Sequence, residues 1–318
     1  MITLREFSEK LKEEKQVAII AHVRPDGDTI GSSLGLFFAL NEIGVKAKLY
    51  CSDNVPAKYT FLKGAEEFSD GEIDKDTTAL VSVDVAEIGR VGKYGYDFEK
   101  ARRTFNIDHH ISNTRFAKIN YVKETASCAE NIFDLIKELG AKVDVNIANA
   151  LATGVITDTG NFRHKNVTEE TLKKATELFS LGADFNNIIY NTFSLQTKER
   201  ALLFGRTMAN IKYYHDGRTA VGIVRLADFN DTGAKQEETE GFIDFIMGIK
   251  GVRVGLCVME TEKDKYKISF RAQTEDVNSV AATFGGGGHK LAAGCRIAGE
   301  IEEVLDRLIF AVGRVYPD

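Results

Sequence analysis

The chain has little cysteine, and none of it is spaced for metal binding. Among its 318 residues are four cysteines, and no two of them form a Cys-x-x-Cys motif. Scattered cysteines of this kind are typical of reduced cytosolic proteins, so we expect buried free thiols, without a zinc site or a disulfide framework. The four are Cys51, Cys128, Cys257 and Cys295.

Long apolar runs are also missing. No run approaches the roughly 18 apolar residues that a membrane-spanning helix needs. Residues 1–15 are charged and contain no apolar segment typical of a signal peptide, so we expect none. Together with the cysteine usage, these absences predict a cytoplasmic protein with no membrane contact.

Proline and excess positive charge are scarce as well. Three prolines and no low-complexity tract argue against long disordered linkers. A net charge of −6 disfavours a protein that grips long duplex nucleic acid through its phosphates. A small phosphorylated substrate in a locally basic pocket is still compatible with this charge. The length and the hydrophobic content of 43% suit two globular domains.

The first half of the chain alternates between short apolar runs and helical patterns. This alternation predicts a doubly wound α/β domain with a mainly parallel sheet over residues 1–183. Gly31 and Gly35 share one face of an expected helix, which fits either close packing or room for a phosphate. The spacing of Ser127 and Glu130 predicts a capping box at the start of another helix. The expected strands are 17–21, 45–50, 79–84 and 103–107.

The pattern changes near residue 184. We predict a partly helical linker over 184–206 and a smaller C-terminal α/β domain with a mixed sheet over 207–318. Asp216-Gly217 lies between two strand-like runs, which predicts a hairpin. The glycines at 285–288 predict a loop whose backbone N–H groups approach an anion. Nearby positive charge comes from Arg271, His289, Lys290 and Arg296.

Polar side chains follow three expected strands, where each strand ends. His22, Asp26 and Asp28 follow the first, Asp84 ends the next, and a third runs into Asp108-His109-His110. Ligands of open α/β sheets bind at the carboxyl ends of such strands. A further carboxylate, Asp158, lies near the C-terminal end of a helix, where the dipole disfavours negative charge unless a cation is near.

These groups make a plausible set of metal ligands. Taken singly, each could be an ordinary turn or cap residue, but that explanation must hold at four places in one domain. Two metal ions about 3.5–4 Å apart, with one bridging carboxylate, would use such a set. Imidazole and carboxylate ligands without thiolate suit Mn2+, with Mg2+ or Co2+ as alternatives. The six ligands are His22, Asp26, Asp28, Asp84, His109 and Asp158.

At these positions the sequence resembles the DHH phosphoesterases. Asp26-Gly27-Asp28 after a histidine, the strand-final Asp84, Asp108-His109-His110 and Asp158 match the motifs of that family. Phe284-Gly-Gly-Gly-Gly-His289, with Ala292-Ala293-Gly294 after it, resembles the DHH-associated C-terminal domain. The greatest similarity is to the branch of bacterial oligoribonucleases that also cleave 3'-phosphoadenosine-5'-phosphate (pAp), the nanoRNases.

The resemblance implies a role for each residue. One metal ion would bind His22, Asp26 and Asp84, and the other would bind Asp28, Asp84, His109 and Asp158, with Asp84 as the bridge. His110 would contact the scissile phosphate, and Asp108 would orient the histidines. The active site would lie in a cleft between the two domains. The groups that would hold the substrate phosphate are Arg271, Gly286, Gly287, Gly288 and His289.

By this resemblance, the protein is a two-metal phosphoesterase. It would degrade oligoribonucleotides of about two to five nucleotides to mononucleotides, and would convert pAp to AMP. Alternatives are a pyrophosphatase or polyphosphatase, a cyclic or linear dinucleotide phosphodiesterase, and a single-strand exonuclease. A nucleotide-binding regulator without catalysis is an alternative from another class. The resemblance leaves a homodimer open, and neither long duplex nucleic acid nor a membrane is expected as a partner.

Overall fold

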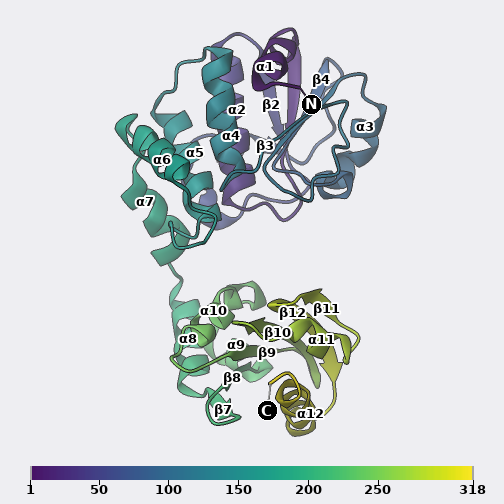
Figure 1. Cartoon of the computed structure of the whole chain (residues 1–318), viewed down its shortest axis with the longest axis vertical. Helices are drawn as coiled ribbons and strands as arrows, with labels where there is room; N and C mark the ends of the chain where they lie inside the picture. The colour runs from purple at the N-terminus through teal and green to yellow at the C-terminus, as the bar shows by residue number, and fades with distance from the viewer. Residues whose placement is uncertain (1, 317–318) are drawn as a thin grey trace. The chain divides into compact units, whose positions relative to one another are not determined.

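The computed structural model describes residues 2–316. The chain forms two compact units, and the division falls between Leu195 and Gln196 (Figure 1). Each unit has a six-stranded sheet with its own hydrophobic cores. The predicted two-domain α/β fold is therefore confirmed.

The first unit contains a sheet in the order β3-β2-β1-β4-β5-β6, and every neighbouring pair is parallel. β2 and β4 flank β1, so the strand order reverses there, and such a switch point is where open α/β sheets bind ligands. The strands are β1 (Gln16–Ile20), β2 (Lys46–Tyr50), β3 (Phe68–Ser69), β4 (Ala79–Val83), β5 (Thr104–Asp108) and β6 (Ile119–Val122).

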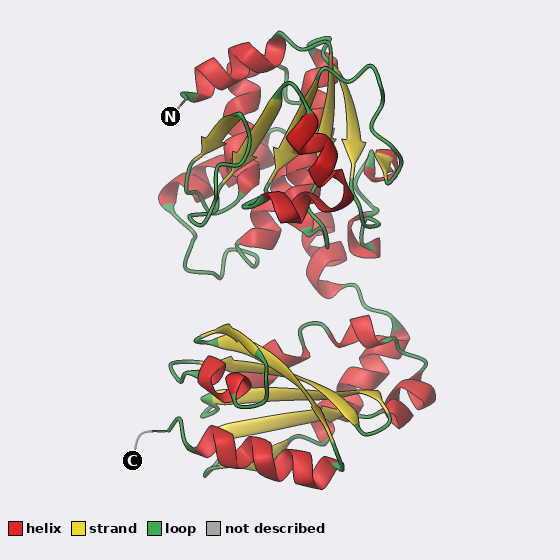
Figure 2. Cartoon of the chain, turned by 90° about the vertical axis from the view of Figure 1, so that its right-hand side faces the viewer, coloured by secondary structure: helices red, strands yellow, loops and turns green. Residues whose placement is uncertain are grey.

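Helices cover both faces of this sheet, as a doubly wound fold requires. Figure 2 shows them in front of and behind the strands of the first unit. In β1, Val17 and Ile19 face the larger core, whereas Ala18 and Ile20 face a smaller core around Tyr94. The helices are α1 (Leu4–Lys12), α2 (Gly27–Glu42), α3 (Gly95–Lys100), α4 (Cys128–Leu139), α5 (Val145–Asp158), α6 (Glu169–Ser180) and α7 (Phe185–Ile189).

The glycines of α2 serve close helix packing. A Cβ atom on Gly31 would lie 2.1 Å from the carbonyl oxygen of Ala150, and one on Gly35 would lie 2.7 Å from the side chain of Leu151. Both neighbours belong to α5, so these glycines let the two helices approach each other. The packing interpretation of this pair is therefore correct.

The second unit contains a mixed sheet in the order β11-β12-β10-β9-β8-β7, in which the β8–β9 pair is parallel and the others are antiparallel. The strands are β7 (Lys212–Tyr214), β8 (Thr219–Val224), β9 (Val254–Glu262), β10 (Lys265–Ala272), β11 (Gly287–His289) and β12 (Ala292–Ala298). The helices are α8 (Lys198–Ala209), α9 (Leu226–Thr232), α10 (Phe242–Met247), α11 (Val277–Ala282) and α12 (Ile301–Gly313).

Local predictions in this unit had mixed outcomes. The hairpin at Asp216-Gly217 is confirmed, because both residues have positive φ between the antiparallel β7 and β8. The prediction of a glycine loop at 285–288 is wrong in part, because Gly287–His289 form the edge strand β11. A Cβ on Gly286 would lie 2.2 Å from the carbonyl oxygen of Gly294 on β12, so close backbone packing explains that glycine.

Two expectations about the whole chain can also be compared with the structure. All four cysteines are buried free thiols, as predicted. Among residues 2–316, no helix is both long enough and apolar enough to cross a membrane.

Candidate metal centre

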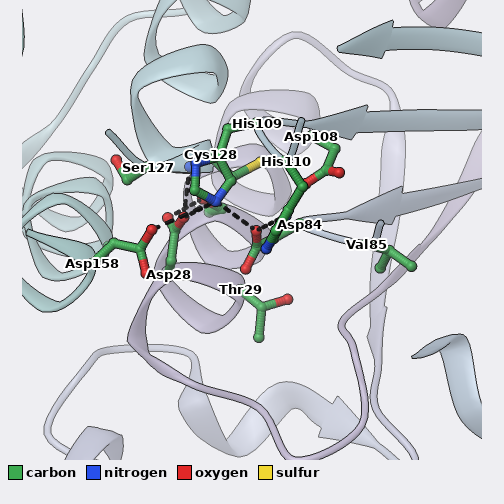
Figure 3. A network of polar contacts seen from close by, with 12 residues as sticks. Asp28, Thr29, Asp84, Val85, Asp108, His109, His110, Ser127, Cys128 and Asp158 are labelled. Carbon is green, nitrogen blue, oxygen red and sulfur yellow. Dashed lines mark hydrogen bonds and ion pairs between the residues drawn. The ribbon is translucent and has the colours of Figure 1, made fainter. Parts of the chain in front are cut away.

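The polar residues at the strand ends meet at one edge of the first sheet. They come from the segments that follow β1, β4 and β5, joined there by the last residue of α5 (Figure 3). Their ligand atoms form three overlapping groups, and within each group all atoms lie within 4.8 Å of one another. The first group is His22, Asp26 and Asp84, the second is Asp28, His109 and Asp158, and the third is Asp84, Asp108, His109 and His110.

The first group forms around the turn between β1 and α2. Asp26 is the N-cap of α2, and its Oδ1 accepts hydrogen bonds from the backbone N–H groups of Asp28 and Thr29. The other oxygen, Oδ2, lies 3.5 Å from Nε2 of His22. His22 bonds the carbonyl oxygen of Val23 through Nδ1, which fixes the ring and directs Nε2 toward the carboxylates.

Asp84 lies between the first and second groups. Its Oδ2 is 3.4 Å from Nε2 of His22, and its Oδ1 is 3.4 Å from Nε2 of His109. The residue is buried and has a φ of 61°, in the left-handed region that costs a non-glycine residue energy. Backbone strain of this kind concentrates at functional sites, and here it accompanies the central carboxylate.

The second group forms where β5, α2 and α5 meet. Nε2 of His109 lies 3.5 Å from Oδ2 of Asp158 and 3.9 Å from Oδ2 of Asp28. Nδ1 of the same ring bonds the carbonyl oxygen of Thr125. Both histidines therefore use Nδ1 for a backbone carbonyl and turn Nε2 toward carboxylates, the arrangement of metal-binding histidines.

Asp28 also caps a helix that is distant in sequence. Its two carboxylate oxygens accept the backbone N–H groups of Cys128 and Ala129 at the start of α4, at 2.5 and 2.9 Å. Ser127, the predicted capping residue, makes no side-chain cap, so that prediction is wrong. Asp28 of α2 caps α4 in place of Ser127, because the positive end of the α4 dipole stabilises the negative charge of its carboxylate.

The pKa values show how much negative charge is concentrated here. Burial, followed by the charges of Asp84 and other neighbouring carboxylates, raises the pKa of Asp158 to about 7. The pKa of Asp28 is also raised well above its usual value, first by burial and then by the negative charge of Asp84. Burial opposes a charge on the histidines, but the neighbouring carboxylates outweigh it and raise the pKa of His22 to about 10 and of His109 to about 11.

These observations fit a site for divalent cations. Oδ1 of Asp84 is buried and accepts no hydrogen bond from the described residues. A buried oxygen without a donor is costly unless a cation binds it. The donors are carboxylate oxygens and imidazole nitrogens, which suit divalent metal ions. The six predicted ligands are thus brought together in a form that can bind metal.

His110 and Asp108 form a pair beside this cluster. Nδ1 of His110 lies 2.8 Å from Oδ1 of Asp108, whose Oδ2 accepts a hydrogen bond from Asn113 at 2.5 Å. Burial would raise the pKa of Asp108, but these two partners keep it below its usual value. The prediction that Asp108 orients both histidines is wrong for His109, which bonds Thr125 instead.

Sequence analysis missed three residues that position the site. Asn113 bonds Asp108 and the carbonyl oxygen of Val85. Thr29 donates to the carbonyl oxygen of Val83 and accepts the N–H of His22, so it joins the ends of β1 and β4. Gly154 leaves space for Asp28, since its Cβ would lie 2.6 Å from Oδ1 of that carboxylate. The only signal for Asn113 was its place three residues after His110.

The predicted phosphate-binding residues belong to the second unit. Arg271 on β10 pairs with Ala292 on β12, and Ala292 pairs with His289 on β11. Directly paired residues of antiparallel strands lie on the same face, so Arg271 and His289 flank Ala292 on one face of the sheet. Gly287 and Gly288 are part of β11, and Gly286 precedes it.

Comparisons with known proteins agree with this geometry. The DHH family N-terminal domain matches residues 16–155, and the DHHA1 domain matches residues 218–315. A bifunctional oligoribonuclease and PAP phosphatase NrnA of Thermus thermophilus is 33% identical, over 97% of this chain and 93% of its own. The protein of the same name from Bacillus subtilis is 31% identical, over 87% of each chain.

A solved structure is also similar over nearly the whole chain. The crystal structure of an exopolyphosphatase-related protein from Bacteroides fragilis matches with a TM-score of 0.87 and 25% identity. The match covers 98% of this chain and 95% of that one. Two matching domains, relatives above 30% identity and the ligand cluster lead to one conclusion: the chain belongs to the DHH family and is a metal-dependent phosphoesterase.

Proposed function

We propose that this protein degrades oligoribonucleotides of about two to five nucleotides to mononucleotides and removes the 3'-phosphate of pAp. The names of the two NrnA relatives support this substrate class. The observation that carries the proposal is the position of Asp84, whose two oxygens face Nε2 of His22 and of His109 at the same distance of 3.4 Å. That position suits a carboxylate shared by two Mn2+ ions.

The six ligands divide between two ions in this proposal. His22 and Asp26 would hold one ion, and Asp28, His109 and Asp158 would hold the other, with Asp84 shared between them. When bound, the ions supply a water of lowered pKa and neutralise charge on the phosphoryl oxygens. The described residues supply the fixed geometry, because backbone carbonyls and helix N-termini hold the ligands before any ion arrives.

His110 acts on the substrate. Its Nδ1 donates to Asp108, so Nε2 is directed away from that partner and is free for a phosphate oxygen. Its hydrogen bond to Asp108 raises the pKa of the imidazole, which favours the protonated form. The side chain is 38% exposed, in contrast to the buried Asp108. A protonated imidazole here can stabilise phosphoryl charge or give a proton to the departing oxygen.

The second unit recognises the substrate phosphate. Arg271 supplies a guanidinium that can bind phosphate oxygens in two places, and His289 faces the same side of the sheet. At Gly287 a Cβ would meet only Oδ1 of Asn278, at 3.8 Å, so this glycine leaves space for a phosphate to approach the backbone. In this proposal residues 1–183 form the metal-binding domain, 184–206 the linker and 207–318 the substrate-binding domain. Four buried free thiols support work in the reducing cytoplasm.

A product analysis with Mn2+ tests the proposal. The panel contains a 5'-phosphorylated RNA dinucleotide, an RNA pentamer, pAp, a cyclic dinucleotide and pyrophosphate, each with a chelator control. We expect stepwise release of mononucleotides from both RNAs and AMP from pAp, with no turnover in chelator. Hydrolysis of pyrophosphate alone would replace the proposal with a pyrophosphatase. Cleavage of the cyclic dinucleotide alone would point to a cyclic dinucleotide phosphodiesterase, and tight nucleotide binding without turnover would point to a regulator.

A further inference from the structure

One face of the second sheet carries a positively charged strip, and the proposed function uses only one end of it. Helices α8, α9 and α10 pack on this face against β8 and β9, where Cys257 and Met259 lie in their core. On the neighbouring strands β10, β12 and β11, the side chains of this face are exposed or half-buried. Figure 1 shows β11 and β12 at the end of the sheet away from α8.

The register of the strands arranges this strip in three rows. The first row contains Arg271, Ala292 and His289. The second contains Ser269, Gly294 and Gly287, and the third contains Lys267 and Arg296. Positive charge therefore stands at both ends of the strip, and the row between them contains only small side chains. A floor of this kind lets a sugar-phosphate backbone come close to the sheet.

The third row carries the unexplained charge. Lys267 and Arg296 are directly paired across β10 and β12, and both are exposed. Like charges in directly opposed positions destabilise a sheet. Among residues 2–316, neither side chain makes a hydrogen bond or ion pair. Glu262 is close enough for Arg296 to lower its pKa, but its carboxylate is already paired with Lys265 at 2.7 Å.

The spacing of the rows matches an extended anion. Lys267 and Arg271 are four residues apart on β10, so their Cα atoms are separated by about 13 Å at the rise of a β-strand. A phosphodiester chain held at Arg271 crosses this distance in a few nucleotides. In a protein with a net charge of −6, two adjacent cations without an acidic partner are best explained by an anion that binds them.

We propose that Lys267 and Arg296 form a second phosphate subsite, which binds backbone phosphates of the longer RNA substrates. This rests on the proposed function, in which Arg271 and His289 hold one phosphate of the substrate. The subsite binds single strands without base specificity, because it presents charge and small side chains and no side chain shaped to read a base. It gives longer oligonucleotides an affinity that pAp and dinucleotides do not gain.

A double variant tests the subsite. Lys267→Ala with Arg296→Ala should lower kcat/KM for a 5'-phosphorylated RNA pentamer about tenfold at moderate salt, and should leave that for the dinucleotide and for pAp within about twofold. The matched control is Lys212→Ala, which removes an exposed lysine from β7, at the opposite edge of the same sheet. The control should change neither value. Neither variant should unfold at a lower temperature, because all three side chains are exposed, and the double variant should be slightly more stable, because it removes like charges in directly opposed positions.

Binding separates this inference from the proposed function. With chelator present, affinity for a labelled RNA pentamer should fall in the double variant, and the slope of log affinity against log salt should become shallower by about 1.4, as for two lost phosphate contacts. An equal loss for dinucleotide and pentamer, or unchanged pentamer binding, would refute the subsite while leaving the nuclease activity in place. If the wild-type protein cleaves no RNA, the proposed function fails, and pentamer binding still decides on the subsite.

Discussion

Asp28 of α2 accepts a hydrogen bond from the backbone N–H of Cys128, one hundred residues later in the chain. The same carboxylate accepts the N–H of Ala129 and the hydroxyl of Ser32. One side chain thus connects the turn after β1 to the N-terminus of α4 while it faces His109. The metal centre and the packing of α2 against α4 therefore depend on each other.

We predict that Gly154→Ala damages both folding and metal binding. The new Cβ would lie 2.6 Å from Oδ1 of Asp28 and also 2.6 Å from the Cβ of Ala129, so the carboxylate or α5 must move. Overpacking of this kind costs about 1–3 kcal/mol. Chemical denaturation should show this loss, and a metal titration should show weaker binding.

Gly205→Ala is the control for this substitution. Gly205 lies in α8, and its Cβ would meet nothing within 4 Å. Alanine favours a helix over glycine by about 0.5–1 kcal/mol, so this variant should be as stable as the wild type or more so. If both variants behave alike, the contact between Gly154 and Asp28 has no special importance.

Asn113→Ala should lower activity without loss of metal. Asn113 holds Asp108, which in turn bonds Nδ1 of His110. Loss of such a supporting contact typically costs about 10–100-fold in activity. The acidic limb of the pH–rate profile should move to higher pH, because Asp108 loses a partner that keeps its pKa low. A purely structural role would lower the rate without moving the profile, and unchanged turnover would show that Asn113 has no part in positioning.

His110→Ala should remove catalysis and retain metal. The imidazole contacts Asp108 and is partly exposed, so its loss should leave the fold intact. The expected fall in kcat is about 10²–10⁴-fold, the usual range for general acid–base catalysis. Activity close to wild type, with metal content unchanged, would exclude a role in the chemical step.

Stability of the metal-free protein should fall as pH rises. Asp158 has a pKa raised to about 7, so folding favours its protonated form and this contribution is lost between about pH 4 and 7. His22 and His109 have values raised to about 10 and 11, so their contribution is complete below about pH 6.5 and is lost above it. With chelator, Tm should be lower at pH 8.5 than at pH 6.

Mn2+ should reverse this trend. Metal displaces protons from these ligands, so the rise in Tm on adding Mn2+ should be larger at pH 8.5 than at pH 6. Asp158→Asn serves as the control, because it should flatten the pH dependence below pH 7. A metal-free Tm that rises between pH 6 and 8.5 would show that the cluster does not titrate in this way.

The sequence could predict that the candidate ligands lie together, because local order decides where they are placed. Apolar runs that end in Asp84 or in Asp108-His109-His110 must place those groups at the same edge of a parallel sheet, whatever the details of packing. The role of the glycine pair in α2 was harder to predict, because the need for Gly31 comes from its contact with Ala150, which is distant in the sequence. Thr29 was equally hidden, since its partner Val83 is 54 residues away.

Two errors have a common cause. Ser127 and Glu130 have the spacing of a capping box, but a distant carboxylate, Asp28, occupies the helix end. The glycines at 285–288 suggested an open loop, but residues 287–289 pair with β12 as an edge strand. In both places a long-range partner replaced a local preference, and single-sequence patterns carry no information on such partners.

The measurement that tests the central claim most directly is the number of Mn2+ ions bound per chain. Titration of metal-free protein, followed by calorimetry and by the magnetic resonance signal of free Mn2+, counts the sites. We predict two ions per chain in the wild type, coupled to the appearance of phosphoesterase activity, and loss of both binding and activity in Asp84→Asn. One ion per chain, or full activity in Asp84→Asn, would contradict a centre in which Asp84 is shared by two metal ions.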